Sequence, residues 1–79
     1  MVLRDEDMVM KMSVSEVMGI AKRFLMEEAG FDTVRVASVV AVEGELNWKV
    51  VADVGQPVTD KKEIIVDDRD GKIVSYKQA

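Results

Sequence analysis

The chain has 79 residues, no cysteine, no histidine and a formal net charge of −4 at pH 7. These properties exclude disulfides, thiolate chemistry, zinc sites of the Cys/His type and acid–base catalysis by histidine. Its basic residues are not concentrated in the way that a phosphate backbone requires, so we expect no nucleic-acid partner.

The beginning of the sequence predicts a protein without export or a membrane span. Three acids lie within the first eight residues, where a secretory signal would need an apolar run. The uncharged stretch 36–42 is far too short to span a bilayer. We therefore expect a cytoplasmic location. Residues 1–12 are interpreted as a flexible or loosely packed N-terminal arm, and residues 13–79 as a single domain.

Residues 13–29 carry the pattern of an amphipathic helix. Ser13 and Glu16 have the spacing of a capping box, in which each side chain accepts a hydrogen bond from the backbone of the other residue. Apolar residues recur at helical spacing, at Val14, Val17, Met18, Ala21, Phe24 and Leu25. Gly30 follows where a left-handed C-terminal cap is expected.

Four segments with strand patterns come next, namely residues 33–42, 48–54, 63–67 and 72–77. Ser38 interrupts the apolar alternation of the first, which indicates either a bulge or burial on both faces. The connections are short and favour antiparallel neighbours. The sequence thus predicts an α+β fold, a two-layer sandwich with one N-terminal helix packed on a four-stranded antiparallel meander sheet.

Two groups of acids are candidates for chemical sites. The stretch 67–71 resembles a calcium loop, but Val66 occupies the position of the first ligand, and Asp and Gly also favour a plain turn. Glu27 and Glu28 are adjacent on the helix, so their side chains diverge by about 100°. We therefore predict no metal site, no cofactor and no catalytic set, and hence no enzymatic activity.

Partner contacts are the remaining class of function. Trp48 is the sole tryptophan, and it is interpreted as a core anchor or, where partly exposed, as a binding anchor. Met8, Met10 and Met12 alternate along the N-terminal arm and suit an adaptable binding surface. We predict these four residues as partner-binding, with a protein or a peptide as the partner. An open sheet edge could also accept a partner strand or a second copy of the chain, which would give a homodimer.

The second half of the chain is similar to a known family. Residues 47–54 place Trp48 at the start of a strand, Pro57 follows in a loop, and residues 65–76 form a strand–Asp–Gly–strand hairpin. In these parts, over roughly residues 13–77, the chain resembles the gas vesicle protein O family of accessory proteins. The resemblance implies a small non-enzymatic accessory module that acts through protein–protein contacts. Gln56 stands where that family usually has an Arg, the proline loop is shorter, and the basic tail is absent.

A second resemblance competes with the first. The spacing from Asp67 to Gly71 and the short preceding loop are similar to those of PepSY-like domains. This resemblance implies a cystatin/PepSY-like fold and a peptide-binding or protease-inhibitory role. PepSY domains are mostly exported or attached to membranes, whereas this sequence shows no export signal. Both resemblances imply the same helix-on-sheet fold and leave the function open between them.

Overall fold

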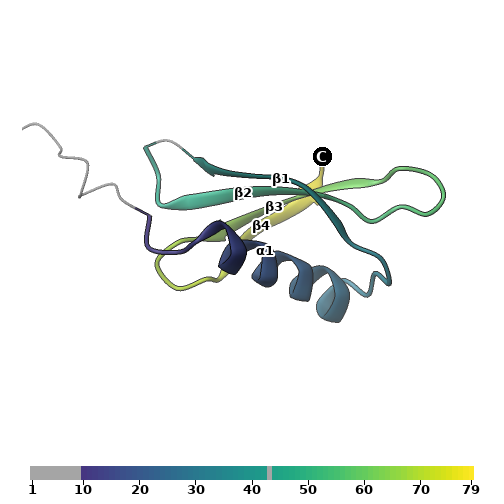
Figure 1. The fold of residues 1–79 in the computed structure, drawn as a ribbon, viewed down its shortest axis with the longest axis horizontal. Coiled ribbons are helices and arrows are strands. Elements are labelled where there is room, and N and C mark those ends of the chain that lie inside the picture. The colour runs from purple at the N-terminus through teal and green to yellow at the C-terminus, as the bar shows by residue number, and fades with distance from the viewer. Residues whose placement is uncertain (1–9, 43) are drawn as a thin grey trace, which may run out of the picture.

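One helix covers one face of a four-stranded antiparallel sheet (Figure 1). The computed structural model describes residues 10–42 and 44–79. The elements in chain order are α1 (Val14–Arg23), η2 (Phe24–Glu28), β1 (Arg35–Val42), β2 (Asn47–Asp53), β3 (Lys61–Asp67) and β4 (Ile73–Gln78). The strands lie in the order β1-β2-β3-β4. This arrangement confirms the predicted α+β fold.

The helix begins at the predicted capping box. The Glu16 N–H donates to Ser13 Oγ over 3.1 Å, and the Ser13 N–H donates to Glu16 Oε1 over 2.9 Å. Its last turn, η2, is π-helical and closes with a bond from the Ala29 N–H to the Phe24 carbonyl. Gly30 then takes a φ of +82°, as the cap prediction requires. Within the described residues, no helix is both long enough and apolar enough to cross a membrane.

The core lies between the helix and the alternate residues of β2 and β3. Its buried side chains are Val17, Ala21, Leu25, Trp48, Val50, Ala52, Val54, Ile64 and Val66. In β1, the register against β2 shifts between Val36 and Ser38, which leaves Ala37 as the extra residue. Of the two explanations for the irregular pattern of β1, the structure therefore shows the bulge.

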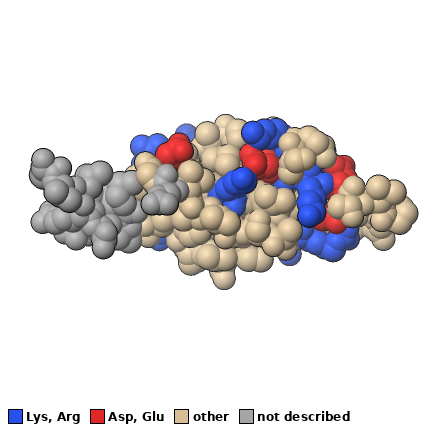
Figure 2. All heavy atoms as spheres, turned by 90° about the horizontal axis from the view of Figure 1, so that it is seen from above, with Lys and Arg blue, Asp and Glu red and all other residues tan. Residues whose placement is uncertain are grey.

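The opposite face of the sheet carries mixed charge. Glu63 lies between two lysines, with Oε1 3.5 Å from Lys49 Nζ and Oε2 3.4 Å from Lys77 Nζ. Figure 2 shows the molecule from above, on the side away from the helix, with basic and acidic side chains interspersed over the visible surface. Partly exposed pairs of this kind stabilise a fold only slightly, and they keep the face hydrated.

Candidate functional site

A buried carboxylate joins three distant parts of the chain at one end of the sheet. Asp68 follows β3 and is only 2% exposed. Its Oδ2 accepts the Lys11 N–H over 2.6 Å, and its Oδ1 accepts the Met12 N–H and the Trp48 Nε1–H, each over 2.8 Å. Burial by itself raises the pKa of Asp68, but the three hydrogen bonds outweigh it and hold the pKa below its ordinary value. The charged form of Asp68 therefore ties residues 11–12 to the start of β2.

The neighbouring acids build the turn between β3 and β4. Asp67 accepts the Arg69 N–H over 2.8 Å and also pairs with the Arg69 guanidinium, and these bonds lower the pKa of Asp67 to about 2. Asp70 accepts the Lys72 N–H over 3.0 Å, and Gly71 has a φ of +73°. These contacts are the turn chemistry that the sequence predicted. Asp68, which had been grouped with the turn acids, instead points into the protein.

An open groove of about 880 Å³ lies next to the residues that Asp68 binds, between the helix and the β3–β4 hairpin. Its apolar lining residues are half-buried and come from three parts of the chain: Met12, Ile20, Phe24 and Ile73. Its charged lining residues are exposed, with both signs represented: Arg23, Glu27, Glu28, Asp70 and Lys72. Because the Met12 N–H is bound to Asp68, the buried carboxylate also positions one wall of the groove.

The helix packs mainly on β1, β2 and β3, and the groove lies between it and the hairpin that leads into β4. The π-helical turn η2 brings Phe24 toward β4, where its ring meets that of Tyr76 edge-to-face at 5.1 Å between centroids. Such a pair stabilises the contact by about 1 kcal/mol beyond its buried area. Within residues 10–42 and 44–79, the sheet order leaves the outer edge of β4 without a neighbouring strand beside the groove.

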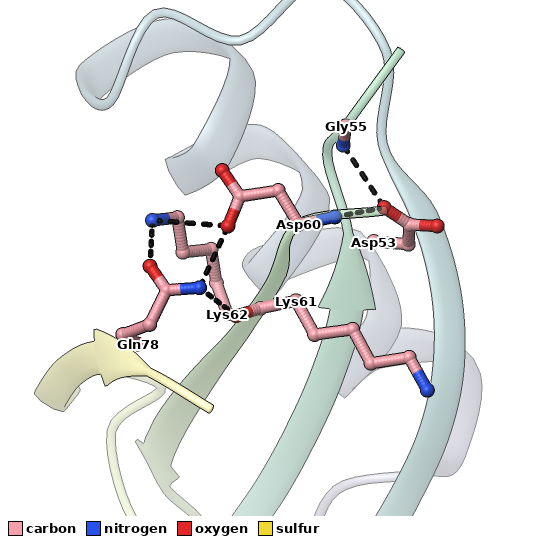
Figure 3. Close-up of polar contacts among 6 residues, drawn as sticks. All are labelled: Asp53, Gly55, Asp60, Lys61, Lys62 and Gln78. Carbon is pink, nitrogen blue, oxygen red and sulfur yellow. Dashed lines mark hydrogen bonds and ion pairs between the residues drawn. The ribbon is translucent and has the colours of Figure 1, made fainter. Parts of the chain in front are cut away.

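A polar network organises the opposite end of the sheet (Figure 3). Asp53 Oδ1 accepts the N–H groups of Gly55, over 2.9 Å, and of Asp60, over 3.0 Å. Arg35 Nη2 lies 3.3 Å from Asp53 Oδ2 and donates to the Gly55 carbonyl over 2.6 Å. The backbone bonds from Asp60 and Gly55, together with Arg35, hold the pKa of Asp53 below its ordinary value.

The same network joins the end of β4 to the β2–β3 loop. The Gln78 amide donates to Asp60 Oδ1 over 2.7 Å and to the Lys61 carbonyl over 3.0 Å (Figure 3). Lys62 Nζ donates to Gln78 Oε1 and lies 3.5 Å from Asp60 Oδ1. The side chains of Asp53, Asp60, Lys62 and Gln78 thus each have a partner within the fold, which indicates a structural role.

The structure places the predicted binding residues in different environments. Trp48 is 7% exposed and belongs to the core, so the condition attached to its binding role, partial exposure, is not met. Met10 and Met12 are half-buried and pack against the core, and Met12 also lines the groove. Met8 lies outside the described residues. Asp68 was missed as a central residue, because a buried acid and a turn acid look alike in a sequence.

Metal binding and similarity to known proteins complete the description of the site. Among residues 10–42 and 44–79, no group of three or more acidic side chains could hold a metal ion. Comparisons with protein-family models, curated proteins and solved structures found no match to this chain. The resemblances to the gas vesicle protein O family and to PepSY-like domains therefore stay predictions.

Proposed function

We propose that this chain is a small, cytoplasmic, non-enzymatic accessory module that acts through protein–protein contacts, as its resemblance to gas vesicle protein O implies. The observation that carries the proposal is the groove beside β4, which combines an apolar lining with exposed charges of both signs. A volume near 880 Å³ lies within the range of ligand sites in proteins. Its occupant in this proposal is an extended segment of a gas vesicle structural protein, with an apolar side chain between Ile20 and Ile73.

The perturbed carboxylates support a binding role rather than a catalytic one. Asp53, Asp67 and Asp68 all have lowered pKa values, and each accepts hydrogen bonds from backbone N–H groups. A carboxylate held ionised by backbone donors stabilises a loop or a turn and is a poor proton acceptor at neutral pH. The chemistry of these groups is therefore accounted for by the fold.

The proposal is tested by binding the immobilised chain to purified gas vesicle structural proteins. Ile20→Glu places a charge among the apolar lining residues of the groove and is expected to abolish retention. Met26→Glu is the matched control, because Met26 lies on η2, is 47% exposed and does not line the groove. Circular dichroism checks that both variants fold. Absence of retention by the parent chain, or equal retention by both variants, would contradict the proposal.

The free edge of β4 favours a second candidate function, a PepSY-like peptide-binding or protease-inhibitory domain. A peptide added along β4 would gain main-chain hydrogen bonds and could insert a side chain into the adjoining groove. Amide hydrogen exchange in the presence of candidate peptides distinguishes this function from the first one. Peptide binding is expected to protect the amides of residues 73–78 without any gas vesicle protein present. Exchange that stays unchanged along the whole chain would exclude it.

The proposal also includes self-association through one of the two sheet edges that are open within the described part of the chain. Either β1 or β4 offers unpaired backbone groups to a second copy of the chain.

A further inference from the structure

The outer edge of β1 is unusual because no side chain after Arg35 carries a charge. Residues 36–42 consist of Val, Ala and Ser alone. Edge strands are normally protected from pairing by charged residues, proline or a bulge. The bulge of β1 lies near its start, at Ala37, so the ladder with β2 is regular from Ser38 to Val42. Val40, in the middle of this regular segment, is 54% exposed.

The edge formed by β4 differs mainly in its charge. It carries Lys77 and ends at Gln78, which is engaged by Asp60. Its register against β3 shifts between Ile73 and Ser75, so Val74 is an extra residue near the start of the strand, and the ladder is regular only from Ser75 to Gln78. Of the two edge strands that the described residues form, β1 therefore offers the longer regular row of backbone groups, and the one without charged side chains.

We propose that a second copy of this chain pairs antiparallel along β1, with the two-fold axis at Val40, to form a continuous eight-stranded sheet. This inference rests on the proposed function, and it names the edge and the register. An antiparallel pair about Val40 sets Val40 opposite the partner's Val40, Val39 opposite the partner's Ala41, and Ser38 opposite the partner's Val42. Residues opposite each other share a face, so the two exposed valines cover each other.

Charge at the ends of β1 favours the same occupant. The regular segment sets no like charges opposite each other in the antiparallel arrangement. The register also carries Arg35 toward the β1–β2 turn of the second copy, which holds Glu45 of the partner subunit. Opposite charges then meet at both ends of the pair, because the two-fold axis repeats every contact. The β4 edges and their grooves stay free at the two outer ends of the dimer.

The paired segment is short, so the dimer is expected to be weak and dependent on concentration. Sedimentation velocity of the full chain from micromolar to millimolar concentration tests this. The mass of the parent is expected to rise from 8.8 kDa toward twice that value. Val40→Lys places two lysines at the two-fold axis and is expected to weaken dimerisation at least tenfold. Val74→Lys is the matched control, since Val74 is 55% exposed on the other edge, and it is expected to dimerise as the parent does.

A charge-complementation experiment separates the register from a general loss of association. An equimolar mixture of the Val40→Lys and Val40→Glu variants is expected to form heterodimers, because the two charges meet at the axis. A parent that stays monomeric at all concentrations would overturn the inference. So would dimerisation that is lost in the Val74→Lys variant and kept in the Val40→Lys variant, or a mixture that stays monomeric.

The outcome for the dimer is distinguishable from the outcome for the proposed function. The groove variant Ile20→Glu changes a residue of the groove lining, and the edge variant Val40→Lys changes a residue of β1 that does not line the groove. A monomeric parent that still binds a gas vesicle structural protein would overturn the dimer alone. A dimeric parent that binds none of these proteins would contradict the proposed function alone.

Discussion

The two ends of the sheet are each organised by one aspartate, and the two carboxylates work in different ways. Asp68 is buried and bonds to backbone N–H groups 56 and 57 residues away, as well as to the Trp48 indole. Asp53 is partly exposed and bonds to backbone N–H groups only 2 and 7 residues away. One carboxylate fixes a remote segment against the core, whereas the other shapes its own loop.

This difference determines what each end contributes to the site. Removing a long-range contact frees a segment, and the chain entropy regained opposes folding. At the Asp68 end that segment includes Met12, a wall of the groove. At the Asp53 end the loop closes on itself, with Arg35 of β1 as an additional partner. We therefore expect variants at the Asp68 end to alter both stability and groove binding, and variants at the Asp53 end to alter stability alone.

The largest expected effect is that of Asp68→Ala. The variant loses three hydrogen bonds to a charged acceptor and leaves the buried Trp48 N–H without a partner, so the free energy of unfolding should fall by about 3 kcal/mol. Urea denaturation at pH 7 measures the change. Asp70→Ala is the control, because Asp70 is exposed and accepts one bond within the turn. Equal losses in the two variants would contradict the central role of Asp68.

The Asp53 end is probed by its glycine. A Cβ on Gly55 would lie 1.7 Å from the Val58 carbonyl oxygen, which is backbone and must move. Gly55→Ala should therefore lower the free energy of unfolding by about 2 kcal/mol, as other changes that overpack a site do. Gly19→Ala is the matched control, since a Cβ there meets nothing within 4 Å and helical alanine is favoured by about 0.5–1 kcal/mol. In thermal denaturation, the melting temperature should fall for Gly55→Ala and rise for Gly19→Ala.

The comparison of the two ends also explains what the sequence could predict. The helix, the four strands and the bulge near Ser38 follow local patterns of spacing and alternation, and the structure confirms them. The turn acids Asp67 and Asp70 make bonds two residues away, within reach of a local rule.

The features that escaped prediction depend on contacts between distant residues. Nothing in the local sequence of Asp68 separates it from Asp67, and only the packing of residues 11–12 and Trp48 around it makes it a buried acceptor. The groove likewise depends on how the helix, Met12 and the β3–β4 hairpin come together, and these are far apart in the sequence. The π-helical turn η2 has no pattern of its own in the sequence, yet it supplies three lining residues, Phe24, Glu27 and Glu28.

A smaller effect comes from replacing each aspartate with asparagine. Both backbone bonds at Asp53 end on one oxygen, Oδ1, which an asparagine retains, so that variant loses only the partly exposed pair between Oδ2 and Arg35. At Asp68 both oxygens accept backbone N–H groups, so an asparagine NH₂ would face a backbone donor in a buried site. Asp68→Asn should therefore cost about 2 kcal/mol of stability and weaken groove binding, while Asp53→Asn should cost about 1 kcal/mol or less and leave groove binding unchanged. The urea midpoints of the two variants measure their stabilities. A larger loss of stability in the Asp53→Asn variant than in the Asp68→Asn variant would contradict this prediction.

The smallest expected effect is the response of stability to acid. The folded pKa values of Asp53, Asp67 and Asp68 all lie below the ordinary 3.8, so the unfolded chain takes up protons first as the pH falls. The stabilisation is complete above about pH 5 and decreases from there toward pH 2, because the pKa of Asp67 is lowered to about 2. Urea denaturation at pH 7, 5, 4 and 3 should show a constant free energy of unfolding down to pH 5, followed by a decrease. Asp68→Asn removes one of the three groups and should flatten that decrease, whereas a free energy that rises below pH 4 would show that these carboxylates are not stabilised in the folded chain.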